Sequence, residues 1–111
     1  MSRSDFTTDA IFRKSAEALL ERLLIQLDEV DFDEFEPRYT SGSLNIQFDN
    51  GSVVMLSMQT PTHELWLSAN YTAWHFLCVG GEWIERDTSE SMLEVLSSIL
   101  SEKFQQQVQL V

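Results

Sequence analysis

The stretch LNIQFDNGS, residues 44–52, decides the fold of this chain. Its apolar residues alternate with polar ones up to Phe48, which is the period of a strand with one buried face. The Asn50-Gly51 dipeptide follows, and it favours a tight type I′ hairpin turn, because both turn positions need positive φ. Val54 and Leu56 continue the alternation after the turn. The sequence therefore predicts an antiparallel hairpin with one apolar face.

Further strands are expected on both sides of this hairpin. Residues 63–69 alternate apolar and polar side chains, 74–79 form a mostly apolar run, and 83–85 form a short strand. Gly80-Gly81 supplies a tight turn between the last two. Residues 38–40 predict a short strand before the hairpin. Five or six strands joined by such short turns would form an antiparallel meander.

Helical periodicity frames these strands. Roughly over residues 9–30, apolar residues recur at three- and four-residue spacing. This helix must end by Glu36, because Pro37 disfavours helical geometry in the residue before it. A second helix is expected with Thr88 or Ser89 as its N-cap. The apolar stripe of the first helix is Phe12, Ala16, Leu19, Leu20, Leu23, Leu27 and Val30. The apolar face of the second is Met92, Leu93, Val95, Leu96, Ile99, Leu100 and Phe104.

Two helices flanking a meander predict an α+β fold, a two-layer α/β sandwich with both helices packed on one face of a five- or six-stranded antiparallel sheet. The chain has 111 residues, which is one domain, 1–111, because two cores would not fit. The other sheet face would be open to water or to a partner. If Leu65 and Leu67 face the core, Trp66 and Gln59 lie on that open face. There Trp66 is either a binding anchor or is covered by the C-terminal tail or a loop.

Charge and composition restrict the function. The chain carries 18 acidic and 7 basic residues, a net charge of −11. Nucleic acids and anionic membranes are therefore not expected partners, whereas cations and basic protein surfaces are. No apolar run approaches the ~20 residues of a membrane span, and residues 1–5 lack a signal-peptide pattern. Cys78 is the only cysteine and is expected in the core. A single cysteine cannot form an intrachain disulfide, which fits a reducing cytoplasm.

Acidic residues are concentrated where the first helix ends. Six of the nine residues from 28 to 36 are acidic: Asp28, Glu29, Asp31, Asp33, Glu34 and Glu36. The helix macrodipole disfavours negative charge at this end, so the placement costs local stability. Carboxylate oxygens suit hard or borderline cations, including Fe³⁺ and Fe²⁺ but also Ca²⁺, Mg²⁺ and Mn²⁺. Without His or Cys such a site would be exposed, weak and unselective. The alternative is a solvated acidic face that keeps a small protein soluble.

As an ordered set, these motifs resemble the bacterial frataxin family of the CyaY type. The similarity runs from about Phe12 to Leu100. It rests on LDE at 27–29, the 44–52 stretch, QTP at 59–61, ELWLS at 64–68, WHF at 74–76 and EWI at 82–84. The resemblance implies an α-β-α sandwich and iron binding by carboxylates of the first helix and the following strand. It also implies a role in iron–sulfur cluster assembly, by contact with a cysteine desulfurase and its scaffold protein.

The resemblance also assigns residues. The implied metal ligands are Asp28, Glu29, Asp31 and Asp33. Other acidic residues of the same region, Glu17, Glu21, Glu34 and Glu36, are further candidate ligands. The implied partner contacts are Gln59, Trp66 and Ser57, the last standing where the family has asparagine. Leu24 and Ile25 stand where typical bacterial members carry two glutamates, a departure within the part of the metal-binding ridge that the resemblance implies.

The leading interpretation is a non-enzymatic accessory protein that binds iron weakly. Some family members are credited with a weak ferroxidase activity, but nothing in this sequence supports it. The sequence has no nucleophile elbow, phosphate loop or dinucleotide fingerprint. We expect a monomer, with iron as a potential cause of oligomerisation. One alternative is a secretion-type acidic chaperone, which would be an obligate dimer indifferent to iron. Another is an iron-oxidising or iron-storing oligomer, which would consume oxygen.

Overall fold

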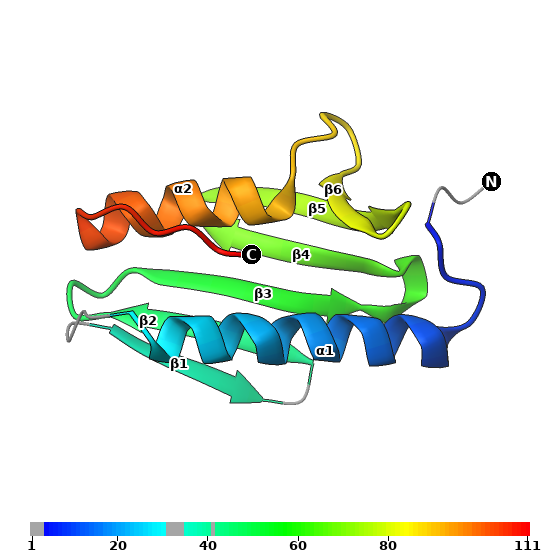
Figure 1. The fold of residues 1–111 in the computed structure, drawn as a ribbon, viewed down its shortest axis with the longest axis horizontal. Helices are drawn as coiled ribbons and strands as arrows, with labels where there is room; N and C mark the ends of the chain where they lie inside the picture. The colour runs from blue at the N-terminus through cyan, green and yellow to red at the C-terminus, as the bar shows by residue number, and fades with distance from the viewer. Residues whose placement is uncertain (1–3, 31–34, 41) are drawn as a thin grey trace.

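The computed structural model describes residues 4–30, 35–40 and 42–111. A helix, six strands and a second helix follow one another along the chain, and both helices lie on one side of the sheet (Figure 1). The elements are α1 (Asp9–Asp28), β1 (Phe35–Thr40), β2 (Ser43–Phe48), β3 (Val53–Gln59), the 3₁₀ turn η1 (Thr60–Thr62), β4 (Glu64–Ala69), β5 (Thr72–Val79), β6 (Glu82–Glu85) and α2 (Met92–Phe104). The predicted α+β sandwich is confirmed, with six strands.

The sheet is a meander in which every strand pairs with its sequence neighbour. The order is β1-β2-β3-β4-β5-β6, and all five pairs are antiparallel. Buried residues alternate along β2 and β4, so one face of the sheet meets the helices. The hairpin expected from residues 44–58 is confirmed as the β2–β3 pair.

The turn within that hairpin differs from the prediction. Four residues separate β2 from β3, and among them only Gly51 has positive φ, at 90°. The Asn50 side chain explains the longer loop, because its Oδ1 accepts hydrogen bonds from the backbone N–H and the hydroxyl of Ser52, at 2.9 and 2.7 Å. Two-residue turns with positive φ at both positions instead join β4 to β5, at Asn70-Tyr71, and β5 to β6, at Gly80-Gly81.

The second helix begins later than expected. Its N-cap is Ser91, whose hydroxyl accepts the N–H of Glu94 at 3.4 Å, and not Thr88 or Ser89. The N–H group of Thr88 is already donated to the carboxylate of Glu85, at 3.2 Å. A buried side chain from β6 therefore shapes the loop before α2. Within the described residues, neither helix is long and apolar enough to cross a membrane.

The core lies between the helices and one face of the sheet. Phe12, Leu20, Leu23 and Leu27 of α1 are fully buried, as their spacing predicts. Val30 lies beyond the end of α1 and is half-buried. The other buried apolar residues of the predicted helical stripes are Ala16, Leu19, Met92, Leu96, Ile99, Leu100 and Phe104.

The C-terminal tail crosses the helix layer and not the open face of the sheet. It runs between α1 and α2 (Figure 1) and buries Leu110, which is 5% exposed. The Leu110 N–H donates to the hydroxyl of Ser97 at 2.9 Å, and the Gln26 side chain bonds both the N–H and the C=O of Val111. The tail therefore closes the helix layer and leaves the opposite face uncovered.

Candidate functional site

The predicted iron ligands that the structure describes lie on α1, at its C-cap and on β1. We call the described members the acidic ridge: Glu17, Glu21, Asp28, Glu29 and Glu36. Asp28 ends α1 and Glu29 caps it, and both are exposed. The last turn of this helix carries no basic residue, so nothing within it offsets the negative helix end. Asp31, Asp33 and Glu34 lie outside the described residues, and their assignment as ligands stays a prediction.

The ridge on α1 faces the edge strand of the sheet. Burial raises the pKa of Tyr39 on β1, and the negative charges of Glu17 and Glu21 raise it further. These two carboxylates therefore lie near enough to β1 to act on its side chains. Glu36 lies on β1 itself and pairs with Arg38 at 3.1 Å, an exposed ion pair that contributes little to stability.

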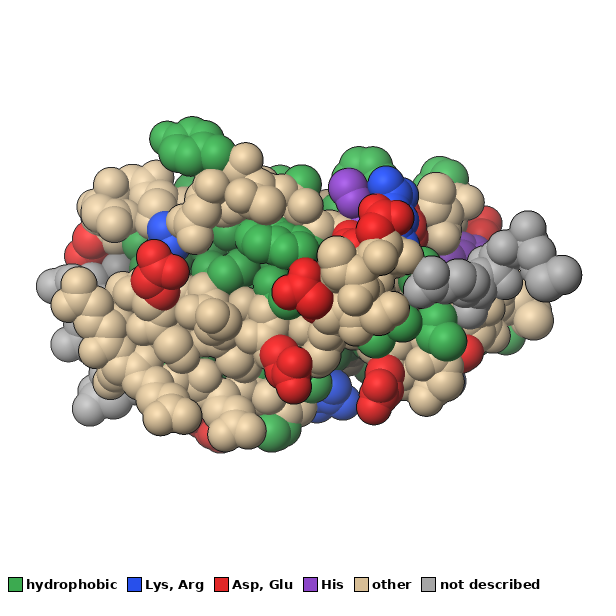
Figure 2. All heavy atoms as spheres, turned by 90° about the horizontal axis from the view of Figure 1, so that it is seen from above, with side chains coloured by type: hydrophobic (Ala, Val, Ile, Leu, Met, Phe, Trp, Pro, Cys, Tyr) green, Lys and Arg blue, Asp and Glu red, His purple; other side chains and the backbone are tan. Residues whose placement is uncertain are grey.

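The ridge does not form a closed metal site in the described residues. Within those residues, no group of three or more His, Cys, Asp or Glu side chains is arranged to hold a metal ion. The ridge instead offers separate, hydrated carboxylates, which bind hard cations weakly. Acidic side chains are also spread over the other side of the molecule, the side of α2 that Figure 2 shows, where basic ones are sparse, in keeping with the net charge of −11.

The uncovered sheet face is centred on Trp66. Its neighbours Leu65 and Leu67 are fully buried, whereas Trp66 is 38% exposed, so the predicted strand register is confirmed. Ser57 on β3 and His75 on β5 lie directly opposite it. The face continues on β3 with Met55 and Val53, 38% and 42% exposed.

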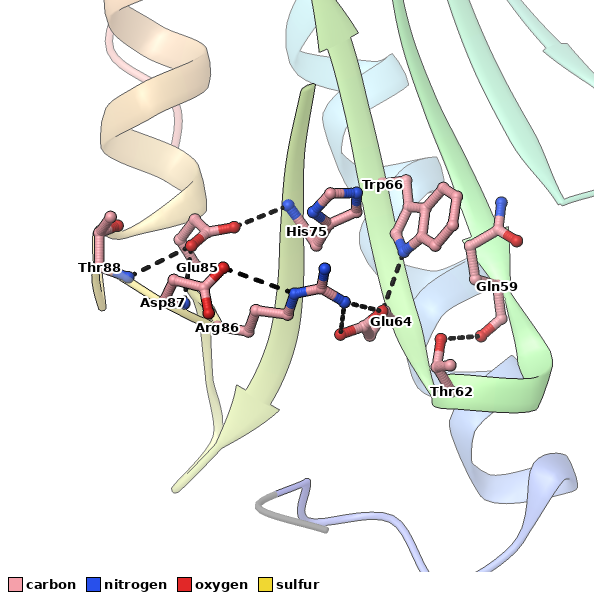
Figure 3. Close-up of polar contacts among 9 residues, drawn as sticks. All are labelled: Gln59, Thr62, Glu64, Trp66, His75, Glu85, Arg86, Asp87 and Thr88. Carbon is pink, nitrogen blue, oxygen red and sulfur yellow. Dashed lines mark hydrogen bonds and ion pairs between the residues drawn. The ribbon is translucent and has the colours of Figure 1, made fainter. Parts of the chain in front are cut away.

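The partner-face residues expected from sequence are brought together, because they sit in adjacent register positions. Gln59 lies two residues after Ser57 on β3, and its amide nitrogen donates to the Ser57 hydroxyl at 3.2 Å. Trp66 lies opposite Ser57 on β4. The three residues therefore form one polar and aromatic patch on the open face, where they are available to a partner. Figure 3 shows Gln59 and Trp66 of this patch.

Two charged residues missed by the sequence reasoning join this patch. Glu64 is only 5% exposed, and its Oε1 accepts the indole N–H of Trp66 at 2.9 Å. The Arg86 guanidinium lies 3.4 and 3.5 Å from the two Glu64 oxygens (Figure 3). The i, i+2 spacing of Glu64 and Trp66 places them on one strand face, and this was the signal available in the sequence. Arg86 comes from beyond β6 and could not be paired with Glu64 from sequence.

Glu85 is the other buried acid among the described residues, and it too was missed. It is 6% exposed, and its carboxylate accepts backbone N–H groups of His75, Asp87 and Thr88, at 2.9, 2.7 and 3.2 Å. Burial is the largest single influence and raises its pKa, but the three hydrogen bonds together lower that pKa below its ordinary value. Glu85 is therefore a structural carboxylate that ties β5 to the loop before α2.

His63 and Cys78 have structural surroundings. His63 was expected on a strand, but it caps η1 with φ of 54°, and its Nε2 lies 2.8 Å from the Asp9 carboxylate. Its ring stacks on Phe12 at 5.1 Å, which links the start of α1 to the β3–β4 connection. Cys78 is buried as expected, and burial, followed by the Asp5 charge, raises its pKa to about 11. Its thiol is therefore protonated and unreactive at neutral pH.

Comparison with known proteins places the chain in a family. A family model of the frataxin-like domain matches residues 5–106. The chain belongs to the frataxin-like family. Among its relatives, the iron–sulfur cluster assembly protein CyaY of Neisseria meningitidis is 32% identical over 94 residues, which cover 85% of this chain and 87% of that protein. The protein of the same name from Paraburkholderia phymatum is 39% identical over 83 residues, covering 73% and 74%.

Solved frataxins have the same fold as this chain. Frataxin from Psychromonas ingrahamii superposes with a TM-score of 0.85 at 20% identity, covering 93% of this chain and 97% of that one. Trimeric frataxin from the yeast Saccharomyces cerevisiae, described as complexed with ferrous, gives a TM-score of 0.73 at 17% identity, covering 83% and 87%. The predicted resemblance and the frataxin sandwich are thus both confirmed.

Proposed function

We propose that this chain is an iron-binding accessory and regulatory protein of iron–sulfur cluster assembly. The proposal rests on the observation that this frataxin-like chain presents two surfaces, an exposed Trp66 on an uncovered sheet face and an acidic ridge on α1 and β1. The CyaY proteins that it resembles are named for cluster assembly. We place the protein in the cytoplasm, because its free Cys78 fits a reducing compartment.

Iron is the proposed cargo, held by carboxylates. We assign Asp28, Glu29, Asp31 and Asp33 as its main ligands, with Glu17, Glu21, Glu34 and Glu36 as additional ones. Hydrated carboxylates bind Fe²⁺ and Fe³⁺ weakly and admit other divalent cations. The ferrous complex of trimeric yeast frataxin supports iron as the metal. We also propose that the chain is a monomer and that bound iron causes it to associate. We assign no catalytic residue, because binding and release of the cargo require none.

The proposed partner is a cysteine desulfurase with its scaffold protein. The acidic ridge would steer the chain toward a basic surface, and Trp66, Gln59 and Ser57 would make the desolvated contact. Charge and aromatic contact act on different rate constants, since steering changes association while a buried anchor changes dissociation. The two surfaces can therefore be tested separately.

Binding kinetics to a purified bacterial cysteine desulfurase–scaffold complex test the proposal. The double variant Asp28→Lys, Glu29→Lys should slow association, with an effect that shrinks as salt rises. Glu102→Lys, a single charge reversal on the exposed face of α2, should change association little. Trp66→Ala should speed dissociation by about 30-fold, as for a hot-spot residue, whereas the exposed aromatic Tyr71→Ala should not. An obligate dimer that binds neither iron nor this complex would contradict the proposal and favour the chaperone.

A further inference from the structure

Glu64 is a buried acidic residue on β4, and burial of an acidic side chain is unfavourable. It is 5% exposed in a chain of net charge −11, and burial of an unpaired carboxylate is strongly unfavourable. Both of its oxygens have partners, since Oε1 accepts from Trp66 and both oxygens lie within reach of Arg86. The two oxygens are thus held by contacts to two residues of the open face.

Glu64 and His75 contact the Trp66 side chain from two neighbouring strands (Figure 3). Its N–H points to Glu64 on its own strand, and the His75 ring meets it edge-on from β5, with centroids 4.7 Å apart. Arg86 is anchored in turn, because its backbone N–H donates to the carbonyl of His75 at 2.9 Å. Glu64 lies on β4 and His75 on β5, so both of these partners of the indole belong to the sheet.

We propose that Glu64 and Arg86 are positioning residues that lock the Trp66 indole with its N–H turned into the protein, so that it offers a partner an apolar ring and no donor. The inference rests on the proposed function, in which Trp66 contacts the assembly complex. The indole has a single donor, and Glu64 already accepts it. The exposed Met55 and Val53 continue the apolar surface along β3. The matching group on the partner polypeptide is therefore an apolar side chain.

The expected benefit of such a lock is pre-organisation. Immobilising one side chain on binding costs about 0.5–1.5 kcal/mol, and a ring already fixed in the free protein avoids that cost. Release of the ring should therefore weaken binding by about 2- to 12-fold. The lock should also be visible without a partner, as a hydrogen-bonded indole N–H.

Variants at Glu64 separate the lock from the charge. Glu64→Ala should shift the Trp66 indole N–H resonance upfield, speed its exchange with solvent, and speed dissociation from the desulfurase–scaffold complex. Glu64→Gln keeps an acceptor for the indole, so it should restore both the resonance and the binding. Trp66→Phe assigns the signal among the three tryptophans. Ser68→Ala, on the exposed face of the same strand, is the control and should change neither readout.

Arg86 supplies an independent arm, useful also if Glu64→Ala does not fold. Arg86→Ala leaves Glu64 buried without its cation, so the carboxylate should turn toward water and release the indole. The double variant Glu64→Gln, Arg86→Ala should recover both readouts, because a neutral amide needs no cation. Failure of this recovery, with the indole still locked, would show that Arg86 itself contacts the partner and would overturn the inference.

The outcomes also distinguish this inference from the proposed function. If Trp66→Ala binds normally, the proposed partner face is wrong and the inference falls with it. If Trp66→Ala weakens binding but Glu64→Ala frees the indole N–H without changing dissociation, only the positioning role is refuted. An unchanged indole resonance in Glu64→Ala would refute the lock itself.

Discussion

Replacing Leu110 by alanine should destabilise the whole fold, although Leu110 lies in a tail without regular structure. The side chain is 5% exposed and belongs to the same core cluster as Phe12 and Leu100. Leucine-to-alanine changes in a core cost about 2–5 kcal/mol, and the value depends on how far the site can collapse. The tail has no regular structure and is held by hydrogen bonds to the side chains of Gln26, Ser97 and Ser101, so it can move inward. We therefore expect the lower half of that range, about 2–3 kcal/mol.

This cost can be converted into a melting temperature. An unfolding entropy of about 2.1 cal/mol/K per residue, applied to the 111 residues of the chain, gives about 0.23 kcal/mol/K. A loss of 2–3 kcal/mol then lowers the melting temperature by roughly 9–13 °C. Far-UV circular dichroism during heating, with urea unfolding at 25 °C, measures both quantities.

Two further variants show whether the tail acts through Leu110. Val111→Ala changes an exposed side chain and keeps the backbone groups that Gln26 binds, so it should cost less than about 0.5 kcal/mol. Ser97→Ala removes the acceptor of the Leu110 N–H and should cost about 1 kcal/mol. If Leu110→Ala unfolds within about 0.5 kcal/mol of the parent chain, the tail does not seal the helix layer in solution and the reasoning is refuted.

Other variants test the carboxylates and the open face by the same unfolding measurements. Glu85→Gln should lower the free energy of unfolding by about 1–3 kcal/mol at pH 7. Because the pKa of Glu85 is lowered in the folded protein, its contribution to stability is complete above the ordinary value of 4.5 and is lost as pH falls through the depressed pKa. The stabilities of the two proteins should therefore converge in acid, and an unchanged difference at pH 2 would contradict this. Asp28→Asn with Glu29→Gln should raise the melting temperature and flatten its salt dependence, because like charges are removed from a helix C-terminus; a clear loss of stability would reveal a structural role. Trp66→Ala should cost less than the ~3–5 kcal/mol of a buried tryptophan, and early unfolding with normal binding would place Trp66 in the core.

Alternation and periodicity were sufficient to predict most of the fold. Leu65, Trp66 and Leu67 take opposite faces of β4 because successive side chains must do so, and this placed the open face correctly. The turn of the β2–β3 hairpin was mispredicted because the Asn50 side chain forms local hydrogen bonds that favour a longer loop. The start of α2 was mispredicted because Glu85, a residue of β6, binds the N–H groups before it.

The candidate site was predictable only where it follows strand register. Trp66, Gln59 and Ser57 follow from alternation and resemblance, and the sheet brings them together. The pair of Glu64 with Arg86 joins residues 22 apart in sequence, through the pairing of β4, β5 and β6, which no local pattern shows. The concentration of acidic residues was evident from the sequence, but charge alone favoured a solvated face, and the metal-binding assignment came from the resemblance. Asp31 and Asp33 lie outside the described residues, and their assignment as ligands stays a prediction.

The central claim is that the acidic residues of α1 and β1 bind iron, and an anaerobic Fe²⁺ titration followed by backbone amide NMR tests it most directly. We expect paramagnetic broadening confined to residues about Asp28 and Glu29, the segment that follows, and the facing part of β1, with affinity in about the micromolar range or weaker. The quadruple variant Asp28→Asn, Glu29→Gln, Asp31→Asn, Asp33→Asn should lose that broadening and keep its fold. Broadening centred on His63, or unchanged in the quadruple variant, would contradict the claim.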